Sequence, residues 1–148
     1  MRTHLTIAFA IIMGLMFSGV ARAEEHPAYL HALSDLRDAR AHLERPASYK
    51  NKVKWAEKAA IGEIDAAIRE IKKASIDDGK DISVHVDVDT NLQWGGRLKH
   101  AKELLKGARE DIEKRETNDV AKGLKKRAFQ HIDAAIAEVD RGMREIHE

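Results

Sequence analysis

Apolar residues recur at steps of three and four positions in four segments of the chain, which is the period of an α-helix with one buried face. The four stripes are Tyr29, Ala32, Leu36, Ala39 and Leu43; Ala60, Ile64, Ala67, Ile71 and Ala74; Leu98, Ala101, Leu105, Ala108 and Ile112; and Ala128, Ile132, Ala135, Val139 and Gly142. Small residues within the stripes allow neighbouring helices to approach closely. The pattern therefore predicts four amphipathic helices that pack as a bundle.

The residues that begin and end helices lie between these stripes. Pro27 suits the first turn of the first helix. Pro46 ends that helix, because the residue before a proline disfavours helical backbone. Ser48 or Asn51 is the candidate cap of the second helix, and Gly79 follows its end.

The second pair of helices has weaker boundary signals. Residues 89–91 offer a cap for the third helix, and 117–119 offer a turn and a cap before the fourth. The Gly95-Gly96 pair disfavours helix, so we place the firm part of the third helix after it.

The chain contains nearly the same helical hairpin twice. The segment 64–68 recurs unaltered as 132–136, 68 residues later, and the segment 31–44 matches 100–113 at an offset of 69 residues. Short connections within each half favour antiparallel pairs. We predict an all-α four-helix bundle of two duplicated antiparallel hairpins, at 27–78 and 92–147, joined by a crossover at 79–91.

The first 23 residues have the features of a cleaved signal peptide. Arg2 and His4 form a short polar region, residues 5–20 are mostly apolar, and Ala21-Arg22-Ala23 is a typical cleavage site. An uncleaved anchor is the alternative, but a membrane span needs about 20 apolar residues. We therefore expect a mature chain of residues 24–148 that is periplasmic or secreted, with no stable membrane insertion after cleavage.

Composition narrows the function classes. Removing Arg2 and Arg22 leaves 24 basic against 25 acidic residues, a net charge of about −1 with neutral histidine, which argues against nucleic acid as a partner. The chain has no cysteine, so disulfides, thiolate chemistry, cysteine-ligated zinc and covalent haem are excluded. The serines lack a nucleophile-elbow context, and no phosphate-binding glycine loop occurs. We expect a protein that is not an enzyme.

Histidines are the strongest candidates for chemistry. His31 and His100 occupy equivalent positions in the two hairpins, His26 precedes the first helix, and His131 stands where the first half has Glu63. Imidazole binds copper, zinc and nickel. We therefore select His26, His31, His100 and His131 as candidate metal ligands. The alternative is that they are hydrogen-bonded or solvated residues inherited through the duplication.

The crossover between the halves has a different pattern. Ile82, Val84, Val86 and Val88 alternate with polar residues, which is the period of an extended strand. One interpretation is an extended segment lying over the bundle with its apolar side chains turned inward. The other is an exposed strand that pairs with a strand of a partner protein.

The chain resembles a set of uncharacterised exported bacterial helical proteins. The likeness covers most of the mature chain and is carried by the segments 26–37, 76–80 and 131–136. More distantly, an exported bundle of repeated helices with histidines before alanine-containing stripes is similar to the bacterial periplasmic small metal-binding proteins, which have denser histidine at regular helical spacing. This chain departs from those proteins in its sparser and irregularly spaced histidines, so the metal hypothesis rests on the histidines named above.

These observations favour an exported, non-enzymatic protein of the bacterial envelope, monomeric or weakly dimeric, that binds a metal ion through histidines. One alternative is a helical interaction or chaperone-like module that uses its charged faces and residues 82–88 on an envelope protein. Another is a carrier of a small apolar ligand, with a cavity near Trp55 and Trp94. The basic run 122–127 is interpreted as a solvated first turn of the fourth helix.

Overall fold

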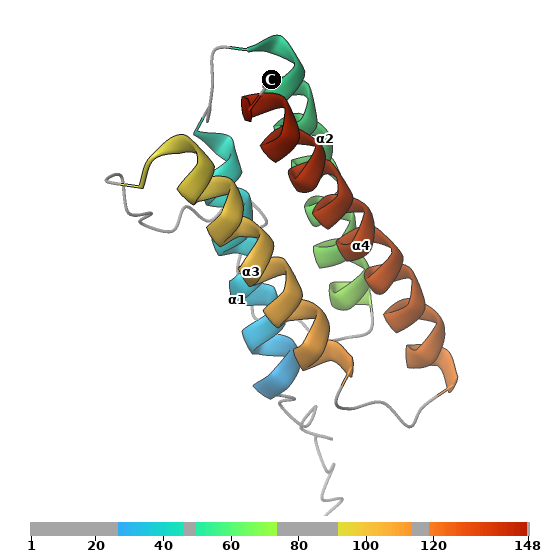
Figure 1. Ribbon diagram of the computed structural model, residues 1–148. Coiled ribbons are helices and arrows are strands. Elements are labelled where there is room, and N and C mark those ends of the chain that lie inside the picture. Colours follow the sequence, from blue (N-terminus) through green and yellow to red (C-terminus); the bar gives the residue numbers. More distant parts are fainter. Residues whose placement is uncertain (1–26, 46–49, 74–91, 114–118, 148) are drawn as a thin grey trace, which may run out of the picture.

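The residues that the structure describes form a bundle of four helices (Figure 1). The computed structural model describes residues 27–45, 50–73, 92–113 and 119–147, which contain no strand. The helices are α1 (Pro27–Glu44), α2 (Asn51–Lys73), α3 (Trp94–Glu113) and α4 (Asp119–His147). The predicted all-α four-helix bundle is confirmed.

Each helix packs most extensively on its counterpart from the other repeat. α2 lies along α4 and α1 along α3, with smaller contacts between α1 and α2 and between α3 and α4. α1 and α4 run in one direction, and α2 and α3 run in the other (Figure 1). Neighbouring helices are therefore antiparallel, and the two hairpins are related by an approximate two-fold axis perpendicular to the helices.

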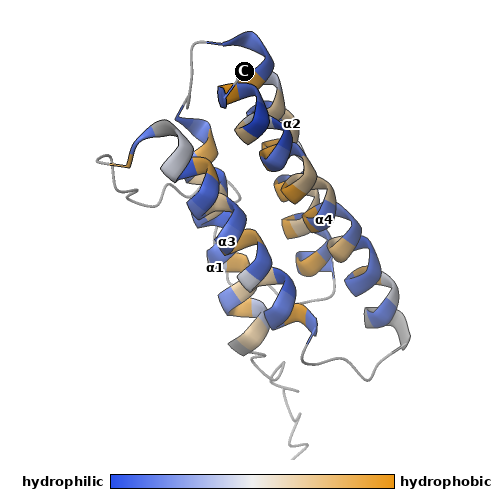
Figure 2. Cartoon of the chain, viewed as in Figure 1, coloured by the Kyte–Doolittle hydropathy of each residue, from blue (hydrophilic) through white to orange (hydrophobic). Residues whose placement is uncertain are grey.

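The core contains the predicted stripes together with further apolar residues such as Leu33, Val53 and Ile68. Every stripe residue within the described ranges is buried, from Tyr29 in α1 to Gly142 in α4, whereas Ala74 lies outside those ranges. Figure 2 shows the apolar residues of α2 and α4 on their inward sides and polar residues on their outward sides. The helical period of the apolar residues thus predicted the buried face of all four helices correctly.

Most helix boundaries agree with the prediction. α1 begins at Pro27 and ends at Glu44, before Pro46, and α4 begins at Asp119. Asn51 is the first residue of α2 rather than its cap, because the amide of Lys54 donates to the carbonyl of Lys50 at 3.2 Å. Ser48, the other candidate cap, is outside the described residues.

The predicted start of α3 is wrong. The helix begins at Trp94 and includes both Gly95 and Gly96, with the amide of Arg97 donating to the carbonyl of Gln93 at 3.0 Å. Arg97 and Leu98 are buried directly after the glycines, so tertiary packing fixes this first turn. Packing outweighs the weak helix propensity of glycine here.

Three predicted features lie outside the described residues: the signal peptide at 1–23, the crossover at 79–91 with its alternating segment 82–88, and the helical continuation to residue 78. Among the described helices, none combines the length and the apolar character that crossing a membrane requires.

Gly62→Ala is expected to raise the free energy of unfolding by about 0.5–1 kcal/mol, because glycine in a helix interior is that much less favourable than alanine. Gly62 is exposed in the middle of α2, and a Cβ added there meets nothing within 4 Å. Urea unfolding followed by circular dichroism measures the change. Gly107→Ala is the matched control with a smaller gain, because its Cβ would lie 2.9 Å from Oδ2 of Asp35. A neutral or destabilising Gly62→Ala would contradict an open helical site.

Candidate functional site

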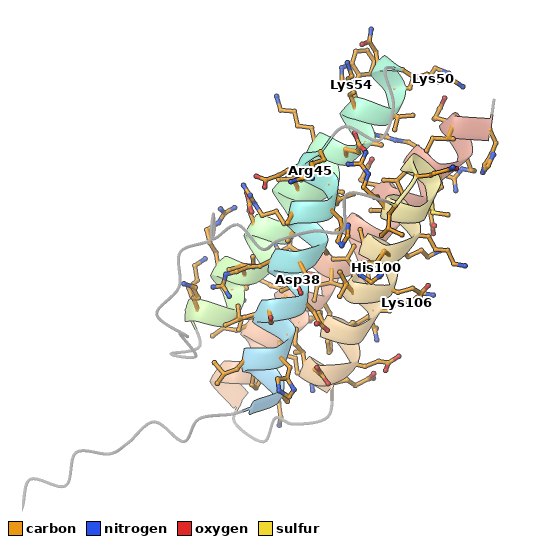
Figure 3. The ribbon with its side chains drawn as sticks, turned by 90° about the vertical axis from the view of Figure 1, so that its left-hand side faces the viewer. Asp38, Arg45, Lys50, Lys54, His100 and Lys106 are labelled. Carbon is orange, nitrogen blue, oxygen red and sulfur yellow. The ribbon has the colours of Figure 1, made fainter. Side chains whose placement is uncertain are left out.

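Two histidines meet where the end of α1 packs on the start of α3. The ring centroids of His42 and His100 are 4.6 Å apart, and the rings are nearly perpendicular, at 76°. His42 is buried and His100 is exposed, so the pair lies at the surface with one ring anchored in the bundle. Figure 3 shows His100 on α3 beside α1, the helix that carries Asp38 and that ends just before Arg45.

The antiparallel packing of α1 on α3 creates this pair. His42 lies in the last turn of α1 and immediately precedes the buried Leu43, while His100 lies between the buried Leu98 and Ala101 of α3. Burial of these apolar neighbours fixes the faces on which the two imidazoles stand. The nitrogen lone pairs of neutral imidazoles are ligands for first-row transition metals, and here two helices supply one imidazole each.

His31 lies at the opposite end of the α1–α3 contact. It is exposed and lies close to Asp35, whose pKa is raised above its ordinary value by burial and by the nearby carboxylates of Asp111 and Asp38, with His31 opposing the shift. The approximate two-fold axis relates His31 and Asp111 to His100 and His42, at the repeat offset of 69 residues. One end of the α1–α3 contact therefore carries two imidazoles, and the equivalent place at the other end carries one imidazole near several carboxylates.

His131 belongs to a third place, in the middle of the α2–α4 contact. Its Nδ1 lies 2.6 Å from Oε2 of Glu63, and both side chains are about one-third exposed. Glu63 and His131 are equivalent residues of the two repeats, so they meet close to the two-fold axis. This contact ties α2 to α4.

The structure separates the predicted metal ligands. His31, His100 and His131 stand at three different places on the bundle, and His26 lies outside the described residues. Among the described residues, no three histidine, aspartate or glutamate side chains are grouped as a metal site. His100 instead has His42 as its neighbour, a residue that sequence reasoning did not select. The two histidines belong to different helices, so no motif within one helix predicts the pair. Their contact depends on how α1 is aligned along α3.

The repeat also contains a pair of ion pairs. Nε of Arg40 lies 2.8 Å from Oδ1 of Asp65 and joins α1 to α2. The equivalent Arg109 and Asp133 join α3 to α4 at 2.9 Å. Each arginine also contacts the glutamate four residues on, Glu44 in α1 and Glu113 in α3. The repeated aspartates thus hold each hairpin together, which explains their presence in both copies.

The tryptophans do not support an enclosed apolar site. Trp55 is 67% exposed on α2 and so lines no internal cavity, while the side chain of Trp94 is outside the described residues. A cavity of about 420 Å³ opens on the surface between the start of α3 and the end of α4, lined by Gln93, Gly95, Gly96, Ile146 and His147. It lies at one end of the bundle and outside its core.

Comparison of the chain with protein-family models, curated proteins and solved structures finds no match. The resemblance to exported bacterial helical proteins therefore stays a prediction from the sequence.

Proposed function

We propose that the protein is an exported, non-enzymatic metal-binding protein of the bacterial envelope, and that it binds copper, zinc or nickel at the His42–His100 pair. The observation that carries this proposal is the contact of two imidazole rings, 4.6 Å between centroids, from helices far apart in the sequence. The export part of the proposal rests on the signal-peptide features of residues 1–23.

Two imidazoles make an open site. Structural zinc sites use four protein ligands, whereas sites with fewer protein ligands keep positions for water or another molecule. The bundle has an apolar core that does not depend on a metal, with large side chains such as Leu36, Ile64 and Leu105 fully buried. The bound ion is therefore exchangeable, which suits a protein that buffers or hands over metal rather than one that needs it to fold.

Isothermal titration of the chain from Glu24 with Cu²⁺, Zn²⁺ and Ni²⁺ tests the proposal. His100→Ala removes an exposed ring and leaves the core intact, and we expect it to weaken binding by about tenfold or more, as even outer-shell changes at metal sites cost 10–100-fold. His147→Ala, another exposed histidine near the end of α4, is the matched control and is expected to bind as the parent does.

The pH dependence gives a second readout. A histidine ligates metal only as the neutral imidazole, so proton competition weakens binding as the pH falls from about 7.5 to about 5.5. Absence of binding, or equal affinity of His100→Ala and the parent, would overturn the proposal. Equal losses in His100→Ala and His147→Ala would show binding by scattered surface histidines and would also overturn it.

A further inference from the structure

The start of α2 presents a tryptophan that neither the core nor the metal proposal uses. Trp55 is 67% exposed, and among the described side chains it is the one large apolar group left open to solvent. Lys52, Trp55 and Lys58 follow at steps of three residues, so they lie on one face of the helix. Lys54 is exposed beside them, at the end of the bundle where α2 begins (Figure 3). We call these four residues the Trp55 face.

The outward side of α2 carries cations and no carboxylate. Among the described residues of this helix, the exposed charged side chains are Lys52, Lys54, Lys58, Arg69 and Lys73. The exposed charged side chains of α3 are mixed in sign: Lys99, Glu103, Lys106, Glu110 and Glu113. A one-signed outward side is therefore a feature of α2 that α3 does not share.

The carboxylates of α2 are turned toward the rest of the bundle. All four are buried or half-buried: Glu57, Glu63, Asp65 and Glu70. Three of them reach a cation or a histidine of α1 or α4 in contacts of 2.6–2.8 Å. Where a cation of the Trp55 face has a carboxylate partner, the cation is the more exposed member, since Lys52 is 67% exposed and Glu145 of α4, at 3.2 Å, is 22% exposed. Pairing thus leaves the positive charge outermost.

We propose that the Trp55 face docks the folded protein on a bilayer surface with anionic headgroups. An indole ring is favoured at the level of the headgroups, and lysines beside it are attracted by the negative surface potential. Lysine stems can lie along the apolar boundary while their ammonium groups stay in water. A bilayer fits better than an acidic protein, because a stable protein interface buries an extended surface and this face offers one apolar ring.

Docking at the surface requires no membrane-spanning helix. The Trp55 face also shares no residue with the His42–His100 pair. Either proposal can therefore fail without the other, and a test of docking in the presence of a metal chelator keeps the two apart.

Vesicles of phosphatidylglycerol mixed with phosphatidylcholine test the proposal, with vesicles of phosphatidylcholine alone as the uncharged comparison. The chain from Glu24 is used with EDTA, and co-sedimentation measures the bound fraction. We expect binding to the anionic vesicles to be about tenfold tighter or more, and added salt to weaken it by screening the lysines. Tryptophan emission is expected to shift to shorter wavelength as the indole of Trp55 leaves water. Trp55→Ala keeps Trp94 and is expected to lose this shift.

A matched pair of double variants locates the contact. Lys54→Gln with Lys58→Gln removes two exposed cations from the Trp55 face and is expected to weaken vesicle binding by about tenfold or more. Lys122→Gln with Lys126→Gln removes the exposed lysines at the repeat-equivalent positions of α4, where Gly123 stands in place of the tryptophan. The second pair is expected to bind as the parent does. Circular dichroism checks that every variant is folded.

Four outcomes would overturn the proposal. Equal binding to charged and uncharged vesicles would show that the headgroup charge is not recognised. Equal losses in the two double variants would show attraction to basic residues in general. Binding without the emission shift would place the contact away from Trp55. Tighter binding to polyglutamate, a soluble acidic polypeptide, than to the anionic vesicles would indicate an acidic protein as the partner instead.

Discussion

Ile132→Ala is expected to lower the free energy of unfolding by about 2–5 kcal/mol, the range for truncation of a buried isoleucine to alanine. Ile132 is fully buried in α4, next in sequence to His131, which contacts Glu63 of α2. Truncation removes three carbon atoms from a closely packed layer and leaves a cavity that the surrounding helices fill only in part. A domain of this size has a total stability of about 5–15 kcal/mol, so the loss is a large fraction of it.

Ile64→Ala is expected to cost a similar amount, because Ile64 is the repeat-equivalent residue in α2 and is also fully buried. Urea unfolding at neutral pH measures both variants. Trp55→Ala is the control: it removes a larger apolar side chain from the same helix, but one that is 67% exposed, so the cost stays within about 0.5 kcal/mol. If Ile64→Ala lowered the free energy of unfolding only slightly while Ile132→Ala lowered it strongly, the two repeats would not contribute equivalent residues to the core, contrary to this prediction.

The buried face of each helix was predictable because it depends on local geometry. Ile132, Leu105 and Leu36 follow the helical period with small residues between them, and a helix with that pattern has one face to bury. The start of α3 was not predictable in the same way. The low helix propensity of glycine is a local property that the sequence shows. The burial of Leu98, which keeps Gly95 and Gly96 helical, depends on contacts with the other helices, which the sequence does not show.

The candidate site depends on information that a repeat does not contain. Two similar hairpins can pack with equivalent helices adjacent or diagonal, and parallel or antiparallel. The observed antiparallel packing of α1 on α3 separates His31 from His100 and brings His42 to His100. Equivalence in the sequence therefore predicted the wrong neighbour for His100, because a two-fold axis across the helices sends equivalent residues to opposite ends.

The same axis accounts for which residues are repeated. Residues that act within one hairpin, such as Arg40 with Asp65, are needed in both copies and appear in both. At the α2–α4 contact, a residue near the axis meets its own repeat-equivalent residue. Two glutamates there would repel each other, so Glu63 and His131 form a complementary pair only because the two copies differ at this position. Divergence between the copies is thus expected at the α2–α4 contact, and Arg127 of α4, whose equivalent in α2 is Ala59, is a further case of it, since it pairs with Glu70.

Glu70→Gln is expected to lower the free energy of unfolding by about 1–2 kcal/mol at neutral pH. Glu70 is 8% exposed and joins α2 to α4, with its two carboxylate oxygens each 2.7 Å from a cation, Nζ of Lys73 and Nε of Arg127. Hydrogen bonds to charged groups contribute about 1.5–3 kcal/mol. The expected cost extends below that range because the side chains of Lys73 and Arg127 are 62% and 51% exposed, so water screens both contacts.

The pH dependence of this effect has a definite sign. Hydrogen bonds from Lys73 and Arg127 lower the pKa of Glu70 below its ordinary value of about 4.5. The folded protein therefore holds the Glu70 proton less tightly than the unfolded chain does, and stability from this carboxylate is present above that ordinary value and is lost as the pH falls through the lowered pKa. The difference between parent and Glu70→Gln in urea unfolding should be full at about pH 7 and should shrink as the pH falls below the ordinary value of about 4.5.

Glu138→Gln is the matched control for this prediction, because Glu138 is the equivalent residue of α4. It has an equivalent cation three residues on, Arg141. The position equivalent to Arg127, however, is Ala59 in α2, which carries no charge. We expect Glu138→Gln to cost less than Glu70→Gln, about 0.5 kcal/mol, because the half-buried Glu138 pairs with a cation of its own helix and so does not join two helices. Equal costs for the two variants, or a cost for Glu70→Gln that does not change with pH, would contradict a bridge between α2 and α4 as the source of the stability.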